Sequence, residues 1–143
     1  MANSTMEKFG YPASLVREYD HWVVLVRPAQ ATLGSLVLAA RSEATAYGDL
    51  PAEAFAEQSE IIPAIEKALQ SLCRYERVNY LMLMMVDPHV HFHVIPRYSG
   101  GRNWDGLEFP DAGWPGPPAL KSAVELSGTQ IEKLRDIISQ AFE

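Results

Sequence analysis

The stretch HVHFHVIPR, residues 89–97, carries three of the four histidines of the chain at alternate positions. Side chains of a β-strand point alternately to its two faces. In an extended conformation His89, His91 and His93 therefore share one face, and the apolar residues between them share the other. The stretch is predicted to be a strand that packs on a core through its apolar face and presents three imidazoles on the opposite face.

A solvated strand face and a metal site are two interpretations of these imidazoles. On a solvated face, all three polar positions would be histidine only by chance. For a metal site, a rise of about 3.3 Å per residue separates the Cα atoms of His89 and His93 by about 13 Å. Zinc-bound nitrogens lie about 2.1 Å from the ion, so one ion does not readily gather all three rings. No metal is therefore assigned.

A third interpretation is chemistry on phosphate. A neutral imidazole nitrogen can attack phosphorus and form a phosphoramidate, which divides one difficult displacement into two easier ones. Flanking imidazoles can donate hydrogen bonds to the phosphoryl oxygens, where charge develops in the transition state. His91 is the natural nucleophile, because it alone has a histidine on either side.

The segments around the histidine stretch predict an antiparallel sheet. Residues 21–28 and 34–41 are rich in β-branched and other apolar residues, and the short link between them suits neighbouring antiparallel strands. Residues 77–86 are almost wholly apolar in their second half, which predicts a strand covered on both faces, with a partner subunit as one cover. A turn is expected at residues 87–88.

Two helices complete the predicted fold. Residues 51–73 place apolar side chains at helical spacing, although Pro63 is expected to kink or split the helix. Ser127 and Gln130 form a capping-box pattern at the start of a C-terminal helix. The sequence thus predicts an α+β fold, with an antiparallel sheet, a central amphipathic helix and a C-terminal helix.

Length and composition predict a single domain over residues 1–143. Residues 1–13 lack the pattern of a secretory signal and are expected to be a frayed terminus. Residues 98–118 hold five glycines and four prolines, which predicts a long loop. The single cysteine, Cys73, allows no internal disulfide and is expected to be buried, so we expect a cytoplasmic protein.

The net charge of −6 argues against nucleic-acid partners and anionic membrane surfaces, both of which favour a basic face. No apolar run reaches the length that spans a membrane. A small anionic ligand remains compatible with this charge, because a few local donors can bind it.

HVHFHVI, residues 89–95, resembles the histidine-triad (HIT) pattern of His, apolar, His, apolar, His, apolar, apolar, and all seven positions match. Residues 27–41 resemble the proline-containing hairpin before the second long strand of that family. Residues 48–55 resemble the start of its central helix. IPR, residues 95–97, resembles the branch that hydrolyses dinucleoside polyphosphates. The resemblance covers about residues 21–98.

The resemblance implies a homodimer whose sheets join edge to edge. It implies that His91 attacks the α-phosphorus of a nucleotide and forms a nucleotidyl-histidine that water then cleaves. His93 would hydrogen-bond the phosphate or the leaving group, and His89 would orient the site and stabilise charge from the other side.

The expected function is hydrolysis of a dinucleoside polyphosphate or a nucleoside phosphoramidate. No cofactor is required, and magnesium would accompany a polyphosphate substrate. A nucleotidyltransferase and a nucleotide-binding protein without significant turnover are the alternatives.

The sequence departs from the family pattern in three places. Many members carry a further histidine where Ser35 stands, and a Gly-Gln-Ser/Thr stretch where residues 85–88 read MVDP. Asp87 would repel a phosphate there unless it points away or is paired. The polar ribose-binding residue late in the first strand is also replaced. The candidate nucleotide-binding residues are Arg27, Gln30, Ser35, Asn79 and Arg97.

Overall fold

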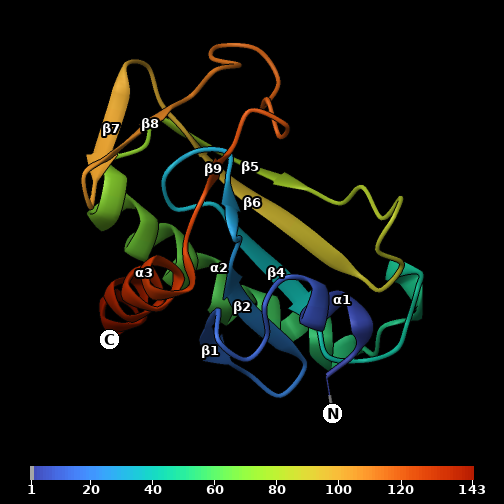
Figure 1. The fold of residues 1–143 in the computed structure, drawn as a ribbon. Coiled ribbons are helices and arrows are strands. Elements are labelled where there is room, and N and C mark those ends of the chain that lie inside the picture. Colours follow the sequence, from blue (N-terminus) through green and yellow to red (C-terminus); the bar gives the residue numbers. More distant parts are fainter. Residues whose placement is uncertain (1) are drawn as a thin grey trace.

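A five-stranded antiparallel sheet with the order β1-β2-β4-β6-β5 forms the centre of the protein (Figure 1). The computed structural model describes residues 2–143. The predicted α+β fold is confirmed, including the antiparallel pairing of the two strands expected at residues 21–28 and 34–41. The strands are β1 (Leu15–Glu18), β2 (Trp22–Val26), β4 (Leu36–Ala40), β6 (His91–Arg97) and β5 (Arg77–Leu81).

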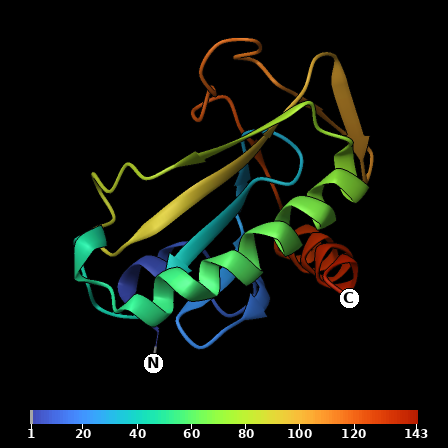
Figure 2. The same ribbon diagram turned by 180° about the vertical axis from the view of Figure 1, so that it is seen from behind.

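Helix α2 (Ala52–Cys73) crosses one face of the sheet, as Figure 2 shows from behind. The prediction that Pro63 splits this helix is wrong, because α2 is one helix of 22 residues. Pro63 is exposed, and it removes only one backbone donor from a long helix that packing holds in place. The side chains of α2 that the core buries are Ala54, Ile61, Ile65, Ala68, Leu69 and Cys73.

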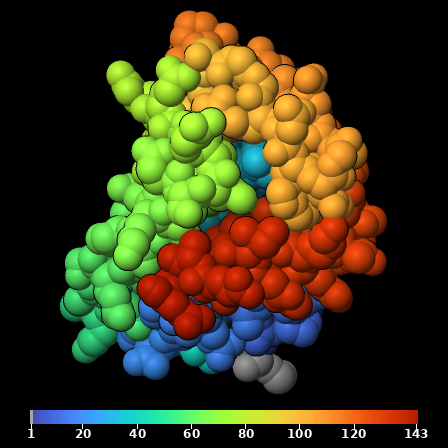
Figure 3. Space-filling view, turned by 90° about the vertical axis from the view of Figure 1, so that its left-hand side faces the viewer, coloured from blue at the N-terminus to red at the C-terminus, as the bar shows by residue number. Residues whose placement is uncertain are grey.

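Helix α3 (Gly128–Ala141) also packs against the core, beside α2 (Figure 3). The predicted capping box is present, since the Ser127 side chain accepts from the backbone of Gln130 and the Gln130 side chain accepts from the backbone of Ser127. Leu134 and Ile138 are its fully buried residues. Within residues 2–143, neither α3 nor any other helix has the length and apolar character needed to cross a membrane.

The opposite face of the sheet is covered by the short helix α1 (Ser4–Lys8). The Asn3 side chain caps this helix by accepting from the Met6 backbone at 2.9 Å. Met6 and Phe9 are buried against the side chains of β2 and β4 that point away from α2. The expectation of a frayed terminus is therefore wrong for residues 3–9, while Met1 lies outside the described residues.

The expected long loop contains a β-hairpin of β7 (Gly101–Trp104) and β8 (Leu107–Pro110). Asp105 and Gly106 form its two-residue turn with φ values of 52° and 76°. Asp-Gly is a typical pair for such a turn, so the sequence did contain this signal. The expectation of a loop without regular structure is wrong for residues 101–110.

The strand expected at residues 77–86 is shorter than predicted, because β5 ends at Leu81. Leu83, Met85 and Val86 follow it with exposed fractions of 48%, 87% and 82%, so the expected burial is wrong for these residues in the single chain. β5 is an edge strand of the sheet. The remaining elements are β3 (Ala29–Gln30), which pairs with β9 (Val124–Glu125), and the 3₁₀ turn η1 (Tyr47–Asp49).

Candidate functional site

Strand β6 places His91 and His93 on the face of the sheet that α1 covers. His91 stands opposite Ala39 of β4, and the two imidazole centroids are 5.1 Å apart. The Phe9 ring, just after α1, lies 5.6 Å from each of them. Both histidines line a cavity of about 520 Å³, a size typical of small-molecule sites. The predicted alternation of the strand therefore holds for these two residues.

The ring of His91 has a defined tautomer. Its Nδ1 lies 2.7 Å from the backbone oxygen of His89. A carbonyl oxygen only accepts hydrogen bonds, so Nδ1 donates and carries the hydrogen of the neutral ring. The lone pair is then on Nε2. This is the arrangement that a histidine nucleophile requires.

His89 has a different position from the one predicted. β6 begins at His91, so His89 lies in the bend before the strand. Its ring contacts Thr5 Oγ1 at 2.9 Å and Glu43 Oε1 at 3.1 Å. The rings that line the cavity are those of His91 and His93, and the ring of His89 is directed to these two side chains instead. No sequence pattern points to Thr5 or Glu43, which lie 84 and 46 residues away from His89.

His93 is held as a neutral imidazole. Burial, followed by the positive charge of Arg27 and by His91, lowers the pKa of His93 to about 4, against a smaller opposite effect of Asp87. Its Nδ1 is buried and has no hydrogen-bond partner among residues 2–143. A neutral imidazole has one N–H to donate, which suits contact with a phosphoryl or leaving-group oxygen.

Charged side chains from distant segments stand around the cavity. Lys8, Arg27 and Lys121 supply three cations, and Asp87 and Glu125 supply two carboxylates. The Asp87 carboxylate lies 3.2 Å from Lys8 Nζ, so it is paired, which removes much of the repulsion expected towards a phosphate. An apolar wall faces these groups and is formed mainly by Phe9, Pro28, Leu83, Met84, Met85, Val86 and Leu120.

Arg27 is the one candidate nucleotide-binding residue that the structure brings to this cavity. Gln30 and Ser35 are fully buried, and their side chains hydrogen-bond the backbone of the connection between β2 and β4. Gln30 donates to the backbone oxygens of Arg27 and Ser35 and accepts from the backbone of Gly34 and Ser35. The Ser35 hydroxyl donates to the Thr32 carbonyl at 2.8 Å. The contacts of Gln30 and Ser35 are those of structural residues.

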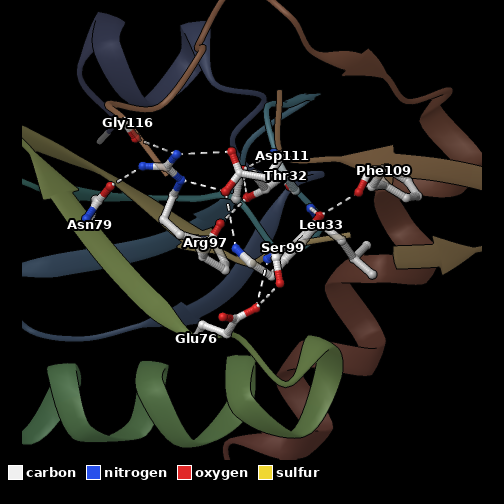
Figure 4. A network of polar contacts seen from close by, with 12 residues as sticks. Thr32, Leu33, Glu76, Asn79, Arg97, Ser99, Phe109, Asp111 and Gly116 are labelled. Carbon is white, nitrogen blue, oxygen red and sulfur yellow. Dashed lines mark hydrogen bonds and ion pairs between the residues drawn. The ribbon is translucent and has the colours of Figure 1, made fainter. Parts of the chain in front are cut away.

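Asn79 and Arg97 belong to a separate polar network (Figure 4). Arg97 Nε donates to Asp111 at 2.7 Å, and its two other nitrogens donate to Asn79 and to the Gly116 carbonyl at 2.8 Å each. The Arg97 and Asp111 side chains are 5% and 1% exposed. Arg97 lines a second cavity of about 500 Å³ together with Asn79 and Trp114. The structure does not bring Asn79 or Arg97 to the histidines.

The single cysteine is not prepared as a second nucleophile. Cys73 is buried as expected, and burial raises the pKa of its thiol to about 11. In the described part of the chain, residues 2–143, histidine, cysteine and acidic residues form no group of three that could hold a metal ion. The nucleophile that this geometry supports best is therefore His91.

A scan against models of protein families found no match, and neither did a search of curated proteins. Solved structures do share the fold. A histidine triad protein from Bradyrhizobium japonicum is 17% identical with a TM-score of 0.70, over 100% of this chain and 98% of its own. One from Sinorhizobium meliloti is 16% identical with a TM-score of 0.69, over 98% and 95%. A hypothetical histidine triad nucleotide-binding protein from Sulfolobus tokodaii is 18% identical with a TM-score of 0.65, over 90% and 83%.

Proposed function

From the histidine-triad fold that the chain shares with these structures, we propose that the protein is a nucleotide hydrolase that cleaves at an α-phosphate. The observation that carries this proposal is the hydrogen bond of His91 Nδ1 to the His89 carbonyl, which leaves the lone pair on Nε2. His91 and His93 line the same cavity, so the lone pair of His91 and the N–H of the neutral His93 ring serve one site.

The proposed reaction has two steps. In the first, His91 Nε2 forms a bond to the α-phosphorus, and the bond from phosphorus to the leaving group breaks. The leaving group keeps the bonding electrons, and the N–H of His93 donates a hydrogen bond to the phosphoryl or leaving-group oxygen. In the second, water attacks phosphorus, the P–N bond breaks, and the nucleoside monophosphate leaves. The imidazole lone pair returns to Nε2 with loss of the water proton to solvent.

The proposed substrates are dinucleoside polyphosphates or nucleoside phosphoramidates. The lining of the histidine cavity supports this choice of substrates. Phe9 and residues 83–86 offer an apolar surface, and Lys8, Arg27 and Lys121 offer positive charges. The chemistry requires no cofactor, because a histidine nitrogen is the nucleophile. Magnesium would enter with a polyphosphate chain.

We also propose that the protein is a homodimer that pairs through the edge of β5. β5 is an edge strand, and the exposed Leu83, Met85 and Val86 follow it. An unpaired strand edge beside exposed apolar residues is a surface on which a second copy can pair. Edge-to-edge pairing there would cover the apolar side chains that the sequence predicts to be buried.

The test is turnover of the wild-type protein beside His91→Asn, on diadenosine polyphosphates and an adenosine phosphoramidate, with and without magnesium. His21→Asn serves as the matched control, because His21 is the one histidine outside the triad. We expect adenosine monophosphate from the wild type and the control, and a loss of at least about 10³-fold in His91→Asn. Near-full activity of His91→Asn, or tight nucleotide binding without turnover by the wild type, would contradict the proposal.

A further inference from the structure

One buried hydroxyl holds both the ring and the main chain of His89. Thr5 Oγ1 lies 2.9 Å from His89 Nδ1, and it accepts the backbone N–H of His89 at 3.3 Å. Thr5 belongs to α1 and is 1% exposed. His89 precedes β6, so its backbone N–H has the Thr5 hydroxyl as acceptor instead of a neighbouring strand.

Glu43 holds the other side of the same ring. His89 Nε2 lies 3.1 Å from Glu43 Oε1. An ionised carboxylate only accepts, so Nε2 carries a hydrogen, and Nδ1 of the neutral ring is free to accept the Thr5 hydroxyl hydrogen. Every donor in the contact from Thr5 through His89 to Glu43 then meets an acceptor without protonation of the ring. Both ring nitrogens of His89 thus have a partner, the buried Thr5 hydroxyl on one side and the 76% exposed Glu43 carboxylate on the other.

The main chain that Thr5 holds is the one that prepares His91. The His89 carbonyl accepts from His91 Nδ1 at 2.7 Å. The next residue, Val90, donates its backbone N–H to the Ala44 carbonyl at 3.1 Å, and its carbonyl accepts from the Ala40 N–H at 2.9 Å. If the His89 carbonyl moved away, the hydrogen of the neutral His91 ring could shift to Nε2. The nitrogen that faces a phosphate would then be a donor rather than a nucleophile.

We propose that Thr5 is a positioning residue for His91. By holding His89 from α1, the Thr5 hydroxyl keeps the His89 carbonyl in place and thereby keeps the lone pair of His91 on Nε2. Glu43 orients the His89 ring so that its Nδ1 accepts from Thr5. The inference rests on the proposed function, because it explains how His91 is prepared to attack phosphorus.

Two substitutions at Thr5 separate the hydroxyl from the shape of the side chain. Thr5→Val keeps the shape and removes the hydroxyl, whereas Thr5→Ser keeps the hydroxyl. We expect Thr5→Val to lower kcat by about 10- to 100-fold with KM within about threefold, since a misplaced reactive group costs rate more than binding. Thr5→Ser should retain most of the wild-type kcat. Glu43→Gln should fall between them, and Glu132→Gln, an exposed acid on α3, is the matched surface control.

The second measurement reads the tautomer directly, by the ¹⁵N chemical shifts of the histidine ring nitrogens in the free protein. In the wild type we expect a protonated Nδ1 and an unprotonated Nε2 at His91, and in Thr5→Val a mixture of the two tautomers. A wild-type ring with its hydrogen on Nε2 would overturn the proposal whether or not Thr5→Val folds. So would a Thr5→Val protein with unchanged shifts and kcat within twofold.

These outcomes differ from a failure of the proposed function. If the wild type turns over no substrate, the ring shifts still decide whether Thr5 sets the His91 tautomer. If the wild type is active and His91→Asn abolishes activity but Thr5→Val does not lower kcat, the hydrolase stands and the positioning role falls.

Discussion

Lys8 Nζ lies 3.2 Å from Asp87 Oδ1, and this ion pair joins α1 to the turn before the histidine stretch at the wall of the cavity. The side chains are 53% and 19% exposed, so the pair is open to solvent on the lysine side. An anionic substrate in the cavity meets both charges. For the proposed phosphate-bearing substrate, Lys8 would offset a carboxylate that otherwise opposes binding.

A double-mutant cycle over this pair tests that relationship. Lys8→Met should raise KM by about tenfold, because it leaves Asp87 unpaired beside the phosphate. Asp87→Asn should lower KM, and the double variant should return KM to near the wild-type value. Steady-state kinetics at one fixed ionic strength measure all four proteins. If both single variants kept the wild-type KM, neither charge would meet the substrate.

The low pKa of His93 predicts a dependence of stability on pH. The folded value of about 4 lies below the ordinary value of 6.5, so between these values the unfolded chain binds the proton and the folded chain does not. The stability contributed by neutral His93 is present above pH 6.5 and is lost as pH falls towards 4. The free energy of unfolding should drop by about 2 kcal/mol between pH 7 and pH 5 from this residue alone.

Urea unfolding of the wild type and His93→Asn at both pH values isolates that contribution. The variant lacks the titrating ring, so its loss of stability between pH 7 and pH 5 should be smaller by about 2 kcal/mol. The same loss in both proteins would show that His93 titrates normally in the folded state.

Asp111→Asn should destabilise the fold strongly with little effect on the histidine chemistry. The substitution leaves the Arg97 guanidinium buried and without its counter-charge, which costs about 3–5 kcal/mol in free energy of unfolding. kcat at a temperature where the variant is folded should stay near the wild-type value, because the Arg97 network does not line the histidine cavity. Asp136→Asn, at an exposed ion pair, should cost less than about 1 kcal/mol.

The proposed dimer predicts that charge in the apolar segment after β5 weakens association. Val86→Glu should shift the wild-type dimer towards monomer in sedimentation velocity at micromolar concentration, since Val86 is 82% exposed in the single chain. Ile137→Glu, at a 41% exposed position on α3, is the matched control and should remain dimeric. A monomeric wild type would contradict the pairing of β5 edges.

Local patterns predicted those parts of the fold whose causes are local. The alternation at residues 89–97 located β6 and identified His91 and His93 as residues of one face, and the Ser127 capping box located the start of α3. The β7–β8 hairpin was missed although Asp105 and Gly106 signal its turn. These elements depend on neighbours in the sequence, which is why their patterns carry the information.

The parts that sequence could not supply depend on contacts between distant segments. Thr5 and Glu43 are ordinary residues until folding brings them to His89 from 84 and 46 positions away. The family pattern predicts Gln30 and Ser35 as ligand contacts, but in the structure their polar groups hydrogen-bond the backbone of the hairpin. Residues 82–86 suggest burial by composition alone, yet the single chain leaves Met85 and Val86 exposed.

Helix α1 has only five residues, and a helix of that length is not stable in isolation. Its order comes from the packing of Met6 and Phe9 on the sheet, so it can open locally while the rest of the core stays folded. Such an opening would withdraw Thr5, Lys8 and Phe9 from the histidines together. Heating should therefore abolish activity at a lower temperature than the one at which the far-ultraviolet circular dichroism of the whole protein is lost, and activity should return on cooling.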